Sequence, residues 1–362
     1  MEQPAKPKTI SDLAGMLGVS SMTIHRAIAG KPDISAKTRD RILAEIERLG
    51  WRPNMAARGL RQGKTYTLGI LVSNVAASFL PEILQGVDRT AEEQGYHTFV
   101  SVHEHDPVRA ERHLRALESK GVDGLVYYPT EAGTEGALLN ELHESMPVVT
   151  LMRSIPGFRG SSVEVDDQLG GSLAAQHLLD LGHRALGFLG YGDNYFSAER
   201  LRGFEETVCQ AGVSLRPEWV AADLELGDDP ARRAATRILT LDHRPTALFC
   251  ASDRLAARAM QAALALGLRV PDDLSLVGFN GDPWTGLLAV PLTTVAQPRL
   301  ELGTRAAQVV LAPEAAVARS GRIILAPKLV PSASTAPVPQ ATTRTHVLTL
   351  DRDGLRSWLS TE

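Results

Sequence analysis

Apolar residues in the first fifty positions recur at the spacing of short α-helices. In the first segment they stand three or four residues apart, at Ile10, Leu13, Ala14 and Leu17. We expect Ser11 to cap this helix. Gly18 should end it, because glycine readily takes the left-handed conformation of a C-terminal cap. The pattern therefore predicts that the ordered chain opens with a short helix.

Two further helices follow with the same kind of spacing. Ser20 is the expected N-cap of the second, and Gly30 with Pro32 ends it. Its inward residues are Ile24, Ala27 and Ile28. Ser35 begins the third helix, whose inward residues are Ile42, Ile46 and Leu49. Short helices with a tight turn between the first two match a helix-turn-helix.

The outer face of the second helix carries small and polar side chains. They are Ser21, Met22, His25 and Arg26. A helix that enters the major groove of DNA, roughly 12 Å wide, must present a slim face able to form hydrogen bonds. Arg can bind guanine at two atoms, and an apolar side chain can contact the methyl group of thymine. The alternative is a solvated helix of a small bundle, in which Met22 and His25 have no such role.

Charge is divided unevenly along the chain. Residues 1–64 hold twelve Lys and Arg against six Asp and Glu, a balance of +6. The whole chain carries −4, so residues 65–362 sum to −4 − 6 = −10. A basic head on an acidic body favours contact between the head and a polyanion such as DNA.

The segment RPNMAARGLRQGKT joins the head to the body. Asn54 can cap a helix of little more than one turn, which is too short to be stable alone in water, and its glycine weakens it further. Such a segment suits a hinge that folds only on DNA, where Leu60 can enter the minor groove. We assign Ala57 to the same surface and Arg58 to a phosphate contact. The alternative is an ordinary linker.

After Thr65, apolar strand runs alternate with amphipathic helices. The strand runs include TLGILVS, YHTFVSVH, DGLVYYP, PVVTLM, ALGFLG, PTALFCAS and LSLVGFN. Repeated βα units with apolar strands indicate a doubly wound parallel sheet. Because the strands are too many for one sheet of ordinary size, we expect two lobes. A ligand is then expected at the carboxyl ends of the strands, in the cleft between the lobes.

The run TISDLAGMLGVSSMTIHRAIAGKPDISAKTRDRILAEIERLGWRPNMAARGL resembles the headpiece of lac repressor family transcription regulators. The likeness continues to about residue 335. It implies an α plus α/β protein, with a helix-turn-helix headpiece of three helices and then a two-lobed, periplasmic-binding-protein-like type I core. The implied boundaries are 1–52 for the headpiece, 53–65 for the hinge, 66–335 for the core with crossovers near 165, 295 and 325, and 336–362 for a flexible tail.

The same resemblance implies partners and residue roles. It implies a cytoplasmic homodimer that reads a pseudo-palindromic DNA operator under the control of a small effector. By residue-wise match, Ser21, Met22 and Arg26 stand at base-reading positions, and Leu60 stands at the position of the minor-groove leucine. Met22 and His25 replace commoner polar residues, so the operator sequence does not follow from the likeness.

The residues that follow the predicted strands form the candidate ligand shell. They are Ser73, Asn74, Phe79, Met152, Arg153, Arg200, Ser252, Asp253, Asn280 and Gln297. Arg200, in SAERLRGF, matches the family's R-x-x-G-F arginine, which commonly binds ligand hydroxyls or a carboxylate. Simpler roles stay open, with Arg200 in a surface ion pair and Asp253 as the cap of a helix that begins at Arg254.

Two departures from the family pattern bear on the ligand. Many sugar-binding members carry aspartate where this chain has Met152 and Asn280. Without those carboxylates, and with Arg153 and Arg200 nearby, the pocket is predicted to be neutral or positive. Burying an anion costs on the order of several kcal/mol unless a cation pairs with it, which favours a carboxylate-bearing ligand here. Our hypothesis is a sugar acid such as gluconate, as in gluconate-responsive members.

Other function classes find little support in the sequence. No apolar run has the length of a membrane span, and MEQPAKPKTI lacks the apolar core of a signal peptide. Cys209 and Cys250 lack metal-ligand spacing and are predicted to be buried free thiols. Without a phosphate loop, a nucleophile elbow or a metal-spaced His/Cys group, we predict neither an enzyme nor a cofactor or metal. The remaining alternatives are a solute-binding sensor of the same fold and a corepressor-dependent, purine-type regulator.

Overall fold

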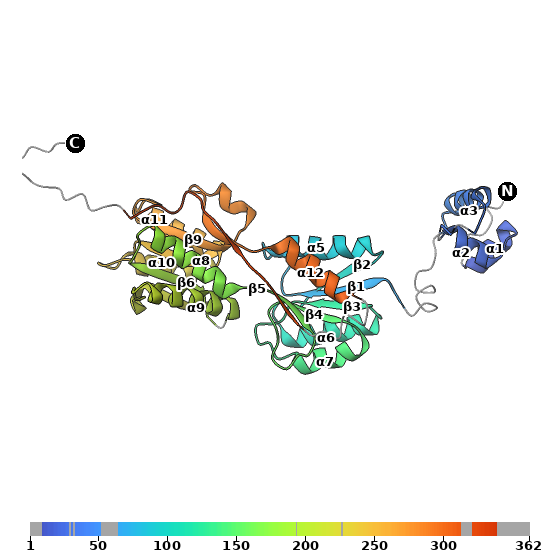
Figure 1. The fold of residues 1–362 in the computed structure, drawn as a ribbon, viewed down its shortest axis with the longest axis horizontal. Coiled ribbons are helices and arrows are strands. Elements are labelled where there is room, and N and C mark those ends of the chain that lie inside the picture. Colours follow the sequence, from blue (N-terminus) through green and yellow to red (C-terminus); the bar gives the residue numbers. More distant parts are fainter. Residues whose placement is uncertain are drawn as a thin grey trace, which may run out of the picture. The chain divides into compact units, whose positions relative to one another are not determined.

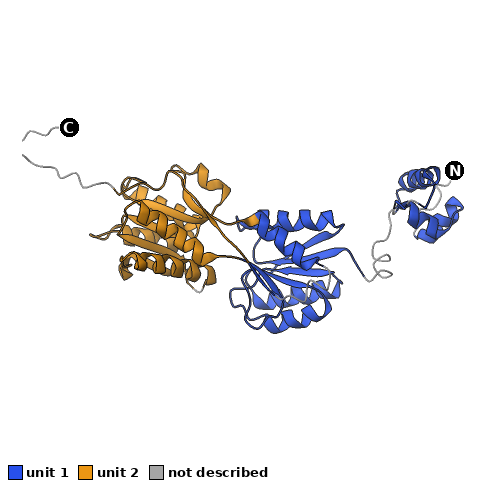
Figure 2. Cartoon of the chain, in the orientation of Figure 1, with its two compact units in different colours: residues 1–164, 300–323 blue, residues 165–299, 324–362 orange. Residues whose placement is uncertain are grey.

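The computed structural model describes residues 9–28, 30–31, 33–51, 64–192, 194–225, 227–312 and 321–338. From Thr67 onward the chain forms two α/β folds, which belong to two compact units (Figure 2). The first unit comprises residues 1–164 and 300–323, and the second comprises 165–299 and 324–362. The chain therefore passes from one unit to the other after Glu164, Arg299 and Ile323.

The headpiece consists of helices α1 (Ile10–Leu17), α2 (Ser21–Ile28) and α3 (Ala36–Leu49). Its buried core consists of Leu13, Ala14, Ile24, Ala27, Ile42 and Trp51. The caps predicted at Ser20 and Ser35 are confirmed, since each side chain accepts a backbone N–H from the first turn of its helix. The cap predicted at Ser11 is wrong.

The first helix begins two residues earlier than its predicted cap. Thr9 accepts the N–H of Asp12 at 3.1 Å, and the Asp12 carboxylate accepts the N–H of Thr9 at 2.9 Å. This capping box satisfies two backbone donors at once, whereas a cap at Ser11 would satisfy one. Gly18 ends the helix in the left-handed conformation, as predicted, with φ of 64°.

The α/β fold of the first unit contains a sheet with the strand order β11-β5-β4-β3-β1-β2 (Figure 1). Its strands are β1 (Thr67–Val72), β2 (His97–Val102), β3 (Gly124–Tyr127), β4 (Val148–Met152), β5 (Ser161–Val165) and β11 (Arg322–Leu325). Its helices are α5 (Leu80–Glu93), α6 (Pro107–Ser119), α7 (Gly136–Ser145) and α12 (Arg299–Val310). The neighbours from β2 to β5 pair in parallel, and β3, β4 and β5 are buried along their length.

The sheet of the second unit has the same arrangement, with the order β12-β10-β9-β8-β6-β7. Its strands are β6 (Leu186–Tyr191), β7 (Val220–Leu224), β8 (Ala247–Cys250), β9 (Ser275–Asn280), β10 (Thr293–Ala296) and β12 (Lys328–Val330). Its α-helices are α8 (Asp167–Asp180), α9 (Tyr195–Gln210), α10 (Asp228–Leu239) and α11 (Asp253–Ala265), and short 3-10 helices span Pro217–Trp219 and Pro283–Leu287. Right-handed crossovers place α9 on one face of this sheet and α10 with α11 on the other. The doubly wound prediction is confirmed.

Helices α8 and α9 touch through their backbones. A Cβ atom on Gly203 would overlap the carbonyl group of Gln168, and one on Gly171 would lie 2.8 Å from the Phe204 nitrogen. Only glycine allows this approach. The glycine of the R-x-x-G-F motif therefore brings the start of α9, with Arg200, against the start of α8.

The last described segment is hydrogen-bonded into the core of the second unit. The Ser334 hydroxyl accepts the N–H of Thr293 and donates to the carbonyl oxygen of Leu276, at 2.8 and 2.6 Å. His183 contacts the carbonyl oxygen of Ala336 at 3.0 Å, and the N–H of Val338 donates to Leu181 at 3.0 Å. Bonded chain thus continues three residues beyond the predicted end of the core at 335.

Candidate functional site: a DNA-reading helix and two ligand-binding sheet edges

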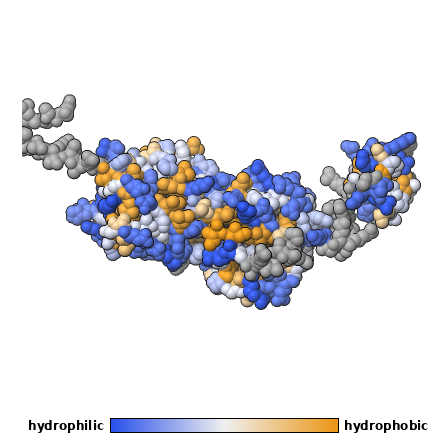
Figure 3. Space-filling view, in the orientation of Figure 1, coloured by the Kyte–Doolittle hydropathy of each residue, from blue (hydrophilic) through white to orange (hydrophobic). Residues whose placement is uncertain are grey.

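The outer face of α2 is exposed and polar. Met22 is 59% exposed, Ser21 and His25 are half-buried, and Arg26 is exposed. The α-helical repeat brings these residues onto one side of α2, opposite the buried Ile24. In Figure 3 the described surface of the headpiece is mostly hydrophilic. The arrangement suits a helix that reads a polar groove.

Arg26 has a partner that it can exchange at little cost. Its Nε atom lies 3.1 Å from Asp33 Oδ2, and both side chains are about half exposed, at 48% and 53%. Exposed ion pairs stabilise a fold by at most about 1 kcal/mol. The guanidinium can therefore turn to a base or a phosphate. The other predicted DNA contacts, Asn54, Ala57, Arg58 and Leu60, lie outside the described residues.

In the first unit, predicted ligand residues gather at the carboxyl ends of β1 and β4. Ser73 directly follows β1 and is buried, and Asn74 is exposed with its side chain bonded to the N–H of Ala76. The ring of Phe79 lies 6.2 Å from that of Tyr128, which follows β3. Met152 ends β4 with a buried side chain and a φ of 71°.

Backbone conformations at this edge are unusual for residues other than glycine. Glu104 and His105, which follow β2, have φ of 53° and 62°, and Met152 has 71°. Such conformations cost on the order of 1–3 kcal/mol each and cluster at binding and catalytic sites. Next to Met152, Arg153 donates to the carbonyl oxygens of Thr130 and Glu131 and so holds the loop after β3.

In the second unit, Arg200 is a buried ion pair partner. Its Nε atom lies 2.7 Å from Asp167 Oδ1, and the two side chains are only 6% and 2% exposed. Its Nη1 atom donates to the carbonyl oxygen of Ala251 at 2.6 Å, and its guanidinium lies 3.6 Å from the ring centre of Phe279. The alternative of a surface ion pair is therefore wrong.

The pairing changes the electrostatics that the sequence predicted. Burial raises the pKa of Asp167, while the charge of Arg200 and its hydrogen bond lower it. The acid and the base of this pair largely compensate each other, so Arg200 does not by itself make the edge positive. The predicted contribution of Arg200 to a positive pocket is corrected accordingly.

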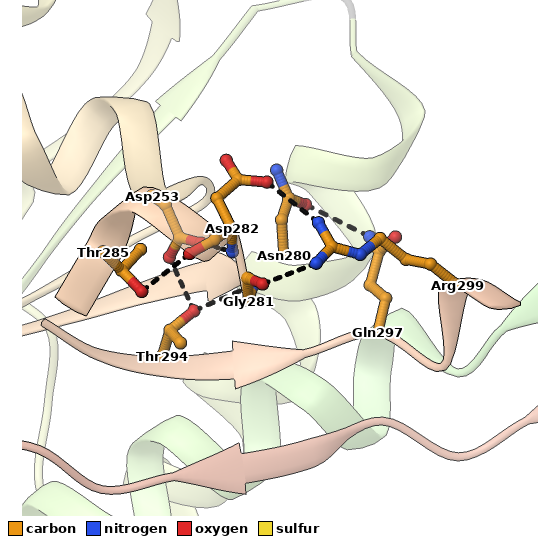
Figure 4. A network of polar contacts seen from close by, with 8 residues as sticks. All are labelled: Asp253, Asn280, Gly281, Asp282, Thr285, Thr294, Gln297 and Arg299. Carbon is orange, nitrogen blue, oxygen red and sulfur yellow. Dashed lines mark hydrogen bonds and ion pairs between the residues drawn. The ribbon is translucent and has the colours of Figure 1, made fainter. Parts of the chain in front are cut away.

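Asp253 accepts hydrogen bonds from two other segments and does not cap a helix. Ser252 caps α11, accepting the N–H of Leu255, and Asp253 is the first residue of the helix. The Asp253 carboxylate accepts the N–H of Asp282 at 2.7 Å and the hydroxyl of Thr294 at 2.6 Å (Figure 4). Burial raises its pKa to about 7, against the opposing effect of these hydrogen bonds. The capping role predicted for Asp253 is wrong.

Asn280 and Gln297 form an amide pair at the ends of β9 and β10. The Gln297 side chain donates to Asn280 Oδ1 at 3.1 Å, and its backbone N–H donates to the Asn280 carbonyl oxygen at 3.2 Å. The buried Gln297 Oε1 atom has no partner among the described residues. Asn280 itself has a φ of 117°. The pair thus offers hydrogen-bonding atoms to a further group.

A cavity of about 350 Å³ opens beside α9 in the second unit. It is lined by Tyr191, Asn194, Tyr195, Ser197, Ala198, Leu201 and Ala222. Sequence analysis proposed none of these residues as ligand contacts, although Tyr191 directly follows a strand run that it identified. The polar side chains are partly used locally, since Asn194 caps α9 and the Ser197 hydroxyl accepts the N–H of Tyr191.

Other predicted features can also be placed. Cys250 is buried as predicted, but Cys209 is exposed, which corrects the prediction that both thiols are buried. Within the described ranges, no group of at least three His, Cys, Asp and Glu side chains could hold a metal ion. In the same part of the chain, none of the helices has the length and apolar character needed to cross a membrane.

Together, the exposed polar helix and the two sheets with polar carboxyl edges define a DNA-binding protein with a ligand-binding core. Residues 9–54 match the model of bacterial regulatory proteins of the lacI family, and residues 175–335 match that of a periplasmic binding protein-like domain. The repressor PurR of Haemophilus influenzae is 31% identical over 329 residues, which are 89% of this chain and 97% of PurR. The ribose operon repressor of that species is 30% identical, covering 84% of this chain and 91% of the relative.

Solved structures agree with this assignment. The lac repressor dimer bound to operator and the anti-inducer ONPF has a TM-score of 0.80 and 25% identity, covering 91% of this chain and all of the other. The regulator GntR of Chromobacterium violaceum has a TM-score of 0.64 and 26% identity, covering 74% and 99%. The chain belongs to the LacI family of bacterial regulatory proteins. It is a DNA-binding transcriptional regulator with a ligand-binding core, and not an enzyme.

Proposed function

We propose that this chain represses transcription from a pseudo-palindromic operator in the cytoplasm, and that a small ligand bound by the strand-end residues releases it. The observation that carries the proposal is the exposed Met22 and Arg26 face of α2, in a headpiece that has a buried core of its own. A ligand changes operator affinity only as far as its own affinity differs between the two states of the protein, and the effect is reciprocal. Induction suits a catabolic substrate.

We infer that the segment around Asn54–Leu60 becomes ordered on DNA. A helix of this length is marginal in water, and a minor groove that accepts Leu60 would supply the missing contacts. Arg58 would then contact a phosphate. The predicted domain boundaries at 52, 65 and 335 remain part of this proposal.

We infer that the regulator is a homodimer. The edge strand β2 exposes Phe99 and Val100, at 57% and 45%. Exposed apolar residues on an unpaired sheet edge favour association with another chain. A second copy fits because a palindromic operator requires two headpieces. Analytical ultracentrifugation of the native chain and of Phe99→Asp should show a dimer and a monomer, respectively.

We infer that the ligand carries a carboxylate, with a sugar acid such as gluconate as the first candidate. Since Arg200 is paired with Asp167, the cation that supports this inference is Arg153 at the end of β4. Arg153 donates to the backbone carbonyl oxygens of Thr130 and Glu131, which hold its guanidinium near the end of β4. Met152 and Asn280 contribute no charge that would repel an anion.

A purine corepressor is the second candidate. The relatives named PurR support it, and so does the amide pair of Asn280 and Gln297. Amide side chains both donate and accept, as the edge of a heterocyclic base requires, whereas carboxylates only accept. In this case the ligand would strengthen operator binding.

Fluorescence polarisation of operator DNA, with and without gluconate, ribose and purine bases, tests these proposals together. We expect gluconate to weaken operator binding and to raise the melting temperature, because a ligand of the native state stabilises that state. Operator affinity should fall steeply with salt as phosphate contacts release counterions. Binding that is insensitive to salt would contradict the DNA proposal, and a purine-induced tightening would replace the sugar acid by the second candidate.

A further inference from the structure

The chain passes from the second unit to the first after Arg299, and the Arg299 side chain contacts the loop that follows β9. Arg299 is the last residue of the second unit and the first residue of α12. Its Nη1 atom lies 3.1 Å from Asp282 Oδ1, and its Nη2 atom donates to the carbonyl oxygen of Gly281 at 2.7 Å. The two charged side chains are 6% and 2% exposed. A buried ion pair is costly to break, so these contacts fix the loop to the start of the helix.

The same loop is held from its other side. Asp253 accepts the N–H of Asp282, and Thr294 both donates to Asp253 and accepts the N–H of Gly281 (Figure 4). Directly before it, Asn280 has a φ of 117°, a conformation that residues other than glycine rarely take. The surrounding contacts must therefore hold Asn280 in place.

Gln297 completes the connection. It donates from its side chain and its backbone to Asn280, and its carbonyl oxygen accepts the N–H of Arg299 at 2.9 Å. Both members of the amide pair are thus attached to Arg299, one through the loop and the other through the chain. Arg299 joins the candidate ligand contacts to the helix that continues into the first unit.

We infer that Asp282 and Arg299 are positioning residues that orient the Asn280–Gln297 amide pair for the ligand and transmit its displacement to the first turn of α12. The inference rests on the proposed function, in which the amide pair contacts the ligand. Neither charged side chain needs to touch the ligand itself. Because Arg299 is bonded to Asp282 and Gly281, a shift of the loop also shifts the start of α12.

The other two crossovers carry a different ion pair, which serves as a control. Glu164 is the last residue before the first crossover, and Arg322 Nη2 lies 2.7 Å from its Oε2 atom. Glu164 is 3% exposed, whereas Arg322 is 55% exposed, and the pair joins the neighbouring strands β5 and β11 of the other sheet. Loss of this pair tests what a crossover ion pair does without attachment to the amide pair.

Amide hydrogen exchange of the full chain without ligand tests the positioning role. In Arg299→Met we expect residues 280–285 to exchange at least tenfold faster than in the native protein, while Arg322→Met leaves them within twofold. Arg299→Lys should recover part of the protection because it keeps the charge. The double variant Asp282→Asn/Arg299→Met removes the buried unpaired charge and should also exchange faster in this loop. Exchange within twofold of the native rate in both Arg299→Met and the double variant would overturn the inference.

Operator titrations with gluconate as the probe test the transmission. Arg299→Met should bind operator within threefold of the native affinity, but its response to gluconate should be at least tenfold smaller. Arg305→Met, which removes an exposed arginine of the same helix, should respond normally. A full response in Arg299→Met would overturn the transmission role. If the native protein itself ignores gluconate, the choice of ligand fails, and the exchange experiment still decides the inference.

Discussion

The outer face of α2 exposes its polar groups to solvent, whereas the hydrogen-bond network around Asp253 buries them. On α2, Met22 and Arg26 are exposed, and the ion pair of Arg26 with Asp33 is open to solvent. Around Asp253, the carboxylate is fully buried and accepts bonds from two separate elements. A surface that meets a large polyanion gains from long-range attraction and exchangeable contacts. A surface that meets a small ligand must be arranged in advance by buried bonds.

The largest expected effect comes from breaking the buried pair of Arg200 and Asp167. Arg200→Met leaves Asp167 buried without its cation, which should lower the free energy of unfolding by about 3–5 kcal/mol. Urea denaturation measures this loss, and Arg202→Met, an exposed arginine on the same helix, is the matched control. Adding Asp167→Leu to Arg200→Met should recover most of the stability. A loss no larger than that of the control would mean that the pair is not structural.

The next effect is a pH dependence from Asp253. Its folded pKa of about 7 lies above its ordinary value of 3.8. Between these values the folded state retains a proton that the unfolded state has released, so stability falls as the pH rises. From pH 5 to 7.5 we expect the native protein to lose on the order of 2–3 kcal/mol relative to Asp253→Asn. Groups that titrate alike in both proteins cancel in this difference, and a difference that is constant with pH would contradict the prediction.

On the DNA side, Arg26→Ala should weaken operator binding by about 1–3 kcal/mol and relax the preference for one base pair. Arg48→Ala removes an exposed arginine of α3 outside the reading face and is the control. Polarisation with operator variants measures both properties. Equal weakening on all sequences would assign Arg26 to a phosphate and not to a base.

The smallest effect is that of a helix cap. Ser35→Ala removes the acceptor for the N–H of Thr38 and should destabilise the headpiece by about 1 kcal/mol. Thermal unfolding followed by circular dichroism measures it. Ser11→Ala, at the position where the cap was wrongly expected, should leave the melting temperature nearly unchanged.

Sequence analysis predicted the features that depend on residues close together in the chain, and missed those that depend on distant residues. The helices of the headpiece, most of their caps and the exposed face of α2 depend on residues a few positions apart, and periodicity reveals them. The contacts of Asp253 with Asp282 and Thr294 span 29 and 41 positions. No local pattern distinguishes such a residue from a cap, which is why that role was assigned wrongly.

Strands were missed for the same reason. Sequence analysis did not name β5, β7, β10, β11 or β12. In β5, SSVEV is buried although it is largely polar, because Ser162 and Arg322 both donate to Glu164. Arg322 lies 158 positions further along the chain. An apolar run is therefore not a necessary mark of a buried strand.

The bonded segment Ser332–Val338 determines where this protein can be shortened. Ser334 bonds to two neighbouring strands, and Ala336 shares its bonds with His183 and Ser275. A version ending before Ser332 would remove the hydrogen-bond partners of these buried groups and expose the strands that the segment contacts. We expect it to be insoluble. One ending just after Val338 would keep all of these bonds, which makes that position the lower limit for a shortened version.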